Sequence, residues 1–416
     1  MKSLLCILLI FISLGTKAQQ TYSISGIVTD GKGMTLPGAT VFITNSRYIQ
    51  ATNNGGKFSF GNITPGTYEV VVKMLGFEPD IQSVTVRDKP ISLIVTLKES
   101  ITALKAVTIS GTPDPNREKY LELFLKNFIG ETVNSEQCKL LNPNALRFHF
   151  NAAENALQAS ADDFLVVENQ ALGYTLKYLL TKFDLELHHG VLYITGSPYF
   201  EELKGTVIQQ KKWEENRRVA YLSSQRHFFN AVMNNTVKDE GFLVYKIIDR
   251  SAYIAMKYVE QSACLHFSQL IGHRMINQYA VEVSAIDSLF TPDDKNFKTL
   301  ISPRKVAGND TMRLGFIVVY TGEGEAALFY HTGNPLLLPV QLSKKKSNHR
   351  QISQLLPLTD TITIDRNYGW PEKGFDIFGY WAWERIADLT PLDYFGETAM
   401  PAAVSEENHF NKVKPK

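Results

Sequence analysis

Short alternating segments separated by turn residues dominate the first hundred positions. The segments with strand character are 22–28, 39–43, 57–60, 67–73, 83–86 and 91–97. Between them lie Thr29-Asp30-Gly31-Lys32-Gly33, Asn53-Asn54-Gly55-Gly56 and Pro65-Gly66, and Asn, Gly and Pro adopt turn conformations at little cost. Strands this short, with a turn about every ten residues, predict an antiparallel β-sandwich over residues 19–98.

Several motifs in this segment carry a family resemblance. They are Gly26-Ile27-Val28-Thr29-Asp30, Leu36-Pro37-Gly38-Ala39-Thr40-Val41, Gly56-Lys57-Phe58, Pro65-Gly66-Thr67-Tyr68 and Gly76-Phe77. Together they resemble the carboxypeptidase regulatory-like domain, a transthyretin-like (Ig-like) sandwich similar to the module ahead of many Bacteroidetes TonB-dependent outer-membrane receptors. Asn53 stands where that family commonly has Asp, and either residue suits the turn. The resemblance implies an accessory domain without catalysis.

The N-terminus predicts export. Lys2 precedes an apolar run from Leu4 to Leu14, and Ala18 follows as a small residue. A basic start, an apolar stretch of about a dozen residues and a small exit residue are typical of a secretory signal peptide, so we expect residues 1–18 to be removed. That run is shorter than the roughly 20 apolar residues that span a bilayer. No later segment reaches that length, so we expect no transmembrane helix in the mature chain.

The cysteines leave two alternatives open. Cys6 lies inside the apolar run and not at the cleavage point, which argues against a lipid anchor there. Cys138 and Cys264 remain in the mature chain. An exported protein permits a disulfide between them, and two free buried thiols fit the sequence equally well.

The pattern changes after residue 98. Residues 99–112 predict a linker that ends near Pro113 and Pro115, because two close prolines oppose a helix or a central strand. Residues 113–400 mix helical and strand-like segments and predict an α+β region with mostly antiparallel sheet, as one body or two lobes. An apolar stripe within it predicts one long helix over 211–238, and residues 401–416 predict a polar tail. The chain as a whole is expected to be mostly β.

The second region resembles exported Bacteroidetes proteins that carry the same accessory domain. The residues that carry this resemblance are 197–203, Trp213-Glu214-Glu215-Asn216-Arg217, Arg226-His227-Phe228, Glu240-Gly241-Phe242 and the segment 379–394. No activity is assigned to that family, so the resemblance implies an architecture and a location but no mechanism.

The common catalytic signatures are missing from the sequence. No histidine has Glu three residues later or His four residues later, so the zinc-binding pairs of metallopeptidases are absent. A nucleophile elbow, a phosphate-binding loop and an EF-hand loop are absent too. We therefore expect no catalytic residue, no cofactor and no metal, and no activity of the namesake peptidase.

Weaker candidates have simpler structural explanations. An ordinary structural role explains each of them better than catalysis or metal binding does. His188-His189 fits a hairpin tip, Cys264 with His266 fits a core cysteine, and Glu323 and Glu325 with Asp393 fit scattered surface acids. His227 fits a structural histidine on a helix, and Lys344-Lys345-Lys346 fits a solvated basic loop.

A cluster of aromatic residues near the C-terminus offers a contact surface. Tyr380, Trp381 and Trp383 lie close together, and in an extended strand the two tryptophans would share a face. Such a face anchors a glycan or a protein partner, although a buried core explains the same residues and is favoured. We name these three as candidate partner contacts.

Charge and motifs together select a class of function. Lys and Arg number 43 against 42 Asp and Glu, and this balance argues against nucleic-acid binding. We expect a non-enzymatic binding or assembly protein of the cell envelope, in the periplasm or at the outer membrane. Its partner would be an envelope protein, such as a TonB-dependent receptor system, or a glycan. The alternative is a periplasmic hydrolase acting on peptides or glycans.

Overall fold

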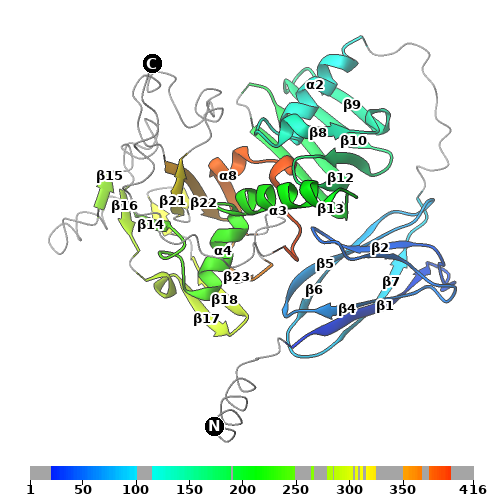
Figure 1. The fold of residues 1–416 in the computed structure, drawn as a ribbon, viewed down its shortest axis with the longest axis horizontal. Coiled ribbons are helices and arrows are strands. Elements are labelled where there is room, and N and C mark those ends of the chain that lie inside the picture. Colours follow the sequence, from blue (N-terminus) through cyan, green and yellow to red (C-terminus); the bar gives the residue numbers. More distant parts are fainter. Residues whose placement is uncertain are drawn as a thin grey trace, which may run out of the picture. The chain divides into compact units, whose positions relative to one another are not determined.

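The chain divides into two compact units in the computed structural model (Figure 1). One unit comprises residues 1–41 and 48–106, and the other residues 42–47 and 107–416. The structure describes residues 20–100, 115–188, 191–248, 264–266, 279–283, 285–302, 305–307, 310–312, 315–324, 350–367 and 374–394. The predicted signal peptide, nearly all of the predicted linker and the predicted tail lie outside these ranges.

The first unit is a β-sandwich, as the sequence predicts. One sheet has the order β4-β1-β7 and the other β3-β2-β5-β6. The strands are β1 (Tyr22–Asp30), β2 (Thr40–Ile43), β3 (Ile49–Ala51), β4 (Lys57–Ile63), β5 (Gly66–Lys73), β6 (Asp80–Val86) and β7 (Ile91–Leu97).

One pairing in the sandwich departs from the antiparallel prediction. β7 runs parallel to β1 along its whole length, from Ile24 opposite Ile91 to Asp30 opposite Leu97. The chain crosses from β6 in one sheet to β7 in the other, and such a crossover permits parallel neighbours that a tight hairpin forbids. Alternate residues of each strand fill the space between the sheets, as the buried Phe58 and Phe60 on β4 show.

The second unit begins with a helix packed on a sheet. The helix α2 (Arg117–Phe128) buries Phe124 and Phe128, which contact Phe183 and Tyr178. The sheet consists of β8 (Cys138–Leu140), β9 (Leu146–Asn151), β10 (Ala156–Ala161), β11 (Leu165–Asn169), β12 (Tyr174–Glu186) and β13 (Val191–Glu202). The short 3-10 helices Ser135–Gln137 and Pro143–Ala145 lie before β8 and β9.

A β-bulge in the long strand β12 keeps one face against the helix. The register with β13 shifts between Leu180 and Lys182. Before the bulge the buried positions are even-numbered, as at Tyr178, and after it they are odd-numbered, as at Phe183. The one extra residue shifts the alternation by one position, so both halves of the strand bury side chains on the same face of the sheet. Position 196, beside the bulge, requires glycine, because a Cβ there would lie 2.2 Å from the Tyr178 ring.

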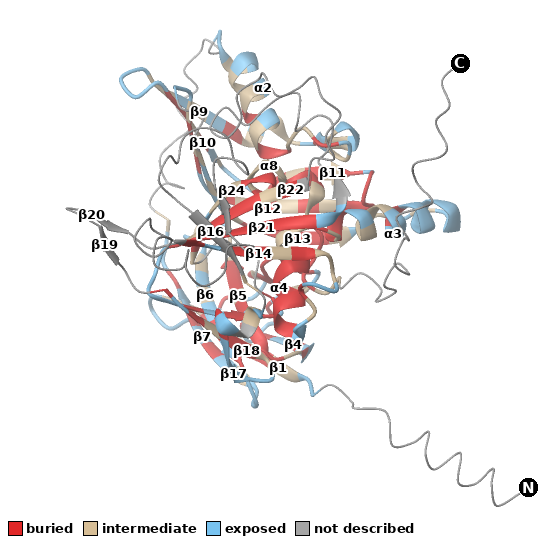
Figure 2. Ribbon diagram, turned by 90° about the vertical axis from the view of Figure 1, so that its left-hand side faces the viewer, coloured by how far each residue is buried: buried red, intermediate tan, exposed pale blue. Residues whose placement is uncertain are grey.

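The prediction of one long helix is wrong, because the chain breaks it in two. The observed helices are α3 (Val207–Tyr221) and α4 (Gln225–Asn234). Between them Ser223 has a positive φ of 65°, and Ser224 caps α4 by accepting a hydrogen bond from the His227 N–H. A serine N-cap inside an apolar stripe interrupts a helix without disturbing the helical period. Figure 2 shows α3 largely exposed and α4 buried along nearly all of its length.

Antiparallel strands make up most of the other described residues of the second unit, as predicted. One sheet has the order β15-β16-β14-β21-β22-β24, another β17-β18-β23, and β19 pairs with β20. These strands are β14 (Phe242–Ile248), β15 (Cys264–His266), β16 (Tyr279–Glu282), β17 (Phe290–Asp294), β18 (Phe297–Ile301), β19 (Lys305–Ala307), β20 (Asp310–Met312), β21 (Phe316–Gly324), β22 (Arg350–Pro357), β23 (Thr361–Asp365) and β24 (Phe375–Gly379). The short helix α8 (Tyr380–Trp383) follows β24, and the 3-10 helix Ile386–Asp388 follows α8. A further 3-10 helix, Ile286–Ser288, precedes β17.

A buried arginine holds the last described segment. Arg226 on α4 is 7% exposed. Its Nη1 donates to the carbonyl oxygens of Thr390 and Pro391 at 3.1 and 2.8 Å and to Thr390 Oγ1 at 3.2 Å. Its Nη2 donates to the carbonyl oxygens of Leu392 and Tyr394 at 2.9 and 3.1 Å. Five donated bonds from one side chain fix the path of residues 390–394 over α4.

In the part of the chain that the structure describes, the helices are all too short or too polar to traverse a lipid bilayer.

Candidate binding site

The sheet of β9, β10, β12 and β13 has one apolar face and one polar face. Phe148, Leu157 and Phe183 belong to the core under α2. Because successive residues of a strand point to opposite faces, their neighbours lie on the other side. The polar face, as we call it, comprises Arg147, His149, Gln158, Ser160, Lys182, Asp184 and Tyr193.

Strand register places these residues in rows. His149 lies opposite Gln158, Gln158 opposite Asp184, and Asp184 opposite Tyr193. This row crosses four strands. Residues directly opposite one another in an antiparallel pair share a face and lie about 5 Å apart. A row of imidazole, amide, carboxylate and phenol groups therefore runs across the sheet.

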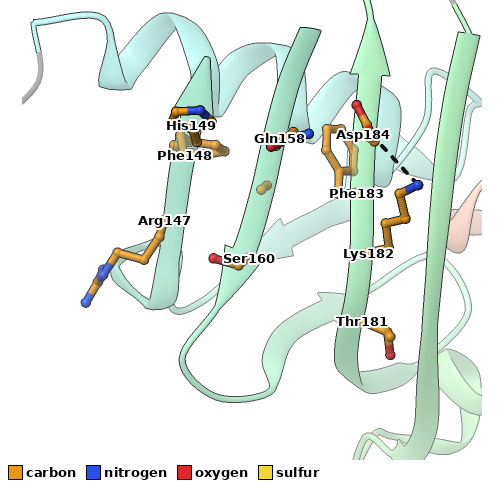
Figure 3. A pocket seen from close by; sticks show the side chains of 10 residues that line it. Arg147, Phe148, His149, Gln158, Ser160, Thr181, Lys182, Phe183 and Asp184 are labelled. Atoms are coloured by element: carbon orange, nitrogen blue, oxygen red, sulfur yellow. Dashed lines mark ion pairs between the residues drawn. The ribbon is translucent and has the colours of Figure 1, made fainter. Parts of the chain in front are cut away.

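A shallow hollow of about 290 Å³ lies over this face. Figure 3 shows Gln158, Lys182 and Asp184 on neighbouring strands, with the Lys182–Asp184 ion pair as a dashed line. Its ten lining residues come from β9, β10 and β12. The volume approaches the lower end of the range that small-molecule sites occupy.

Two cationic side chains are already oriented on this face. Lys182 Nζ lies 3.9 Å from Asp184 Oδ2 and 5.2 Å from the centre of the Tyr193 ring. Arg147 forms a 2.5 Å ion pair with Asp162 Oδ2 and donates to the Asn144 carbonyl oxygen at 2.7 Å. These pairs are exposed to solvent, so each contributes little to stability. They hold Arg147 beside Asp162 and Lys182 beside Asp184.

The polar face offers groups that can recognise a ligand by hydrogen bonds and by an aromatic contact. Donors and acceptors alternate along it, and Tyr193, 58% exposed, presents an aromatic ring. Of the ten residues lining the hollow, Asp184 is the one carboxylate, whereas glycoside hydrolysis uses two. Among the described residues, no cluster of His, Cys, Asp or Glu could hold a metal ion.

The aromatic cluster near the C-terminus lies in the core. Tyr380 and Trp381 are 7% and 8% exposed, and Trp383 packs half-buried against the same cluster. Trp381 Nε1 donates to the Ser223 carbonyl oxygen at 2.7 Å. The segment is the helix α8 and not an extended strand, so residues two apart do not share a face. The core explanation, favoured from the sequence, accounts for Tyr380 and Trp381.

His227 is a structural histidine. Its Nδ1 accepts the Ser223 N–H at 3.0 Å, and its Nε2 lies 3.2 Å from Glu240 Oε2. With Nδ1 occupied as an acceptor, the proton of the neutral ring lies on Nε2 and faces the carboxylate. Burial lowers the pKa of His227, although Glu240 opposes that shift. Both ring nitrogens are therefore occupied by the protein itself.

Cys138 is a free thiol in the structure. Its Sγ donates to the Asn134 carbonyl oxygen at 3.4 Å, so the structure contains no bond from Cys138 to Cys264. Burial, followed by the negative charge of Asp388, raises the pKa of this thiol to about 12. Burial also raises the pKa of Asp388 to about 6, while Asn134 donates to its Oδ1 at 2.9 Å.

The remaining weak candidates form no site among the described residues. His188 follows β12, where its backbone N–H donates to Glu186 Oε1. Asp393 Oδ2 lies 2.6 Å from Arg47 Nη2, an ion pair within the second unit. The positions or side chains that lie outside the described residues are His189, Cys264, His266, Glu323, Glu325 and Lys344–Lys346.

Sequence reasoning missed the polar face, because none of its residues stood out within the region 113–400. Alternation of polar and apolar residues within each of its strands signals a polar side. The order and register of the strands, which bring those sides together, leave no mark in the sequence.

A family model matches the N-terminal part of the chain. Residues 24–109 match the family model "CarboxypepD_reg-like domain", so the resemblance of this segment to that family is confirmed. A search of curated proteins finds no match to the chain.

Solved structures similar to the chain include enzymes and pilins. A 3-chlorocatechol 1,2-dioxygenase from Rhodococcus opacus 1CP is 12% identical with a TM-score of 0.18, covering 21% of this chain and 62% of its own. The minor pilin GBS52 from Streptococcus agalactiae is 13% identical with a TM-score of 0.18, covering 23% of this chain and 48% of its own. The match thus spans less than two thirds of either protein.

Proposed function

We propose that this protein is a non-enzymatic binding protein of the cell envelope that captures a glycan on its polar face. The observation that carries the proposal is the row of His149, Gln158, Asp184 and Tyr193, of which the first three line a hollow of about 290 Å³. An aromatic ring covers the apolar face of a sugar, and amide, carboxylate and guanidinium groups pair with its hydroxyls.

The accessory domain and the N-terminus support the location. A CarboxypepD_reg-like domain is a regulatory-type module and not a catalytic one. The signal-peptide pattern of residues 1–18 favours export. A protein partner such as an outer-membrane receptor is the second candidate for the envelope contact, and it rests on the resemblance of the first unit alone.

Binding fits the lining residues better than hydrolysis does. With Asp184 as the one lining carboxylate, the second acid of a glycosidase is lacking in this hollow. His149 lies opposite Gln158, not opposite a hydroxyl or thiol that it could activate. These groups recognise hydroxyls without transferring protons to a bond that breaks.

An array of defined polysaccharide fragments tests the proposal. The purified full chain should retain one class of fragment, from among peptidoglycan, chitin, xylan and starch oligomers. Tyr193→Ala and Asp184→Asn should each weaken that binding about tenfold, the effect of losing roughly 1.4 kcal/mol. Lys139→Ala changes an exposed lysine on β8 of the same sheet and should leave binding unchanged.

Two outcomes would contradict the proposal. Binding that survives both variants would place the ligand elsewhere on the protein. Release of new reducing ends from a bound fragment would show hydrolysis and favour the alternative function.

A further inference from the structure

A buried turn joins the two helices α3 and α4. At its centre Ser223 is 3% exposed and has a positive φ of 65°, a backbone conformation that residues other than glycine adopt at a cost. Its carbonyl oxygen accepts the Trp381 Nε1–H at 2.7 Å, and its own N–H donates to His227 Nδ1 at 3.0 Å. Two side chains therefore hold this turn in an unfavourable conformation.

The two helices are fixed to different parts of the second unit. On α3, the side chains of Trp213 and Arg217 donate to carbonyl oxygens in the loop 170–173, between β11 and β12, at 2.9 and 2.7 Å. The helix α4 belongs to another hydrophobic core, which it shares with β14 and β24. The turn at Ser223 is thus the connection between two helices that pack separately.

One proton on His227 removes a bond that holds the turn. A backbone N–H is a donor at every pH, so Nδ1 accepts from Ser223 only while the imidazole is neutral and carries its proton on Nε2. In the imidazolium form both ring nitrogens carry a proton. The Nδ1–H and the Ser223 N–H would then be two donors facing each other, and the turn opens to separate them.

Titratable groups from three neighbouring elements face the His227 ring. Glu240, in the turn before β14, has its Oε2 3.2 Å from Nε2. The ring centres of Tyr221 on α3 and Tyr320 on β21 lie 5.3 and 6.0 Å from the imidazole centre. On α4 itself Arg226 precedes His227 and lies 5.8 Å from the centre of the Tyr221 ring. Burial lowers the pKa of His227 below its usual value, although Glu240 opposes that shift.

We propose that the turn at Ser223 is an acid-sensitive hinge between α3 and α4, held closed by neutral His227 and opened when Nδ1 takes up a proton. Opening breaks the bond from the Ser223 N–H and lets the backbone leave its left-handed conformation. It also releases the Ser223 carbonyl oxygen from Trp381. This inference is independent of the proposed glycan site, whose residues lie on β9, β10, β12 and β13.

Linkage gives the direction and the size of the response. In an open, solvated hinge the imidazole has its usual pKa of about 6.5, whereas its pKa in the closed hinge is lower. Closure is therefore complete well above about pH 6.5 and is lost as the pH falls through the pKa of the closed form. At about pH 5 the ratio of closed to open hinges falls by up to about thirtyfold.

Hydrogen exchange of the Ser223 amide measures the hinge directly in the full chain. After correction for the intrinsic exchange rate, its protection factor should be at least about threefold lower at about pH 5 than at about pH 7.5. The amides of α2 should show no such fall. A local readout is needed because Asp388, with its pKa raised to about 6 by burial, affects global stability in the same pH range with the opposite sign.

Two variants that do not titrate separate the roles of the two ring nitrogens. His227→Asn places its Oδ1 near the position of Nδ1 and accepts from Ser223 at every pH, so the protection factor should not change with pH. His227→Gln reaches toward Glu240 but has no acceptor near Nδ1, so the amide should exchange rapidly at both pH values. His188→Gln is the matched control, because His188 is exposed after β12, and it should retain the wild-type response.

Three results would overturn the hinge. They are equal protection of the wild-type Ser223 amide at both pH values, a fall in His227→Asn as large as in the wild type, and a fall that extends equally through α2. Circular dichroism checks that the variants fold. If His227→Asn does not fold, the wild-type comparison decides alone, because a fall confined to the turn supports the proposal and no fall rejects it.

Discussion

Replacing Arg226 with methionine should loosen the last described segment of the chain. The guanidinium donates five hydrogen bonds to residues 390–394 from a position 7% exposed to solvent. Methionine fills a similar volume and donates none of them. Burial lowers the pKa of Arg226, but a guanidinium stays protonated at neutral pH, so the wild-type bonds are charge-assisted.

The structure sets the size of the effect. A charge-assisted hydrogen bond contributes about 1.5–3 kcal/mol net, and a carbonyl left unpaired in the interior costs about 1–3 kcal/mol. The cost of burying the guanidinium offsets part of this sum. We therefore expect Arg226→Met to lower the free energy of unfolding by about 3–5 kcal/mol. Arg226→Lys keeps the charge but cannot reach four carbonyl groups, so about half that loss is expected.

Urea unfolding followed by tryptophan fluorescence measures this loss in the full chain. Trp381 lies in the core beside α4, so it reports on this region. Arg218→Met is the control, because Arg218 forms an exposed pair with Glu215 within α3 and should leave the midpoint unchanged. Equal midpoints for Arg226→Met and Arg218→Met would refute the reasoning.

Three further predictions concern the second unit. Burial raises the pKa of Asp388 to about 6. The contribution of the protonated carboxyl group to stability is therefore complete below about pH 4 and is lost as the pH rises through about 6. In Asp388→Asn the urea midpoint should lose this part of its pH dependence, and a pH dependence equal to that of the wild type would contradict the prediction. The Cys138 thiol, with its pKa raised to about 12, should resist alkylation in the folded protein at pH of about 8 and react once unfolded; peptide mass spectrometry measures this, and equal rates in both states would argue against burial. Trp381→Ala should lower the free energy of unfolding by about 3–5 kcal/mol, as urea unfolding measures; unchanged stability with loss of a partner would instead favour a contact surface.

Local patterns predicted the elements of this fold well. The alternating segments of residues 22–97 became the strands of a sandwich, and the family match over residues 24–109 agrees with the motifs. The apolar stripe over residues 211–238 also has the helical period that the sequence predicted. Its interruption at Ser223 and Ser224 was missed, because a capping serine and an apolar stripe are both compatible with a helix until the chain turns.

The candidate site depended on information that the sequence does not carry. Tyr380 and Trp381 were conspicuous by residue type, yet they lie in the core. Gln158 and Asp184 were inconspicuous, yet they lie opposite each other on the polar face. Aromatic residues serve cores and surfaces alike, so their type alone does not decide between the two.

By itself the sequence determined the sandwich, the mostly β character and the lack of linear catalytic motifs, because strand alternation and turn chemistry act over a few neighbouring residues. Only the tertiary structure decided which polar side chains share a face and where the helix breaks. Those outcomes depend on strand order and register, which are set by packing between segments far apart in the chain.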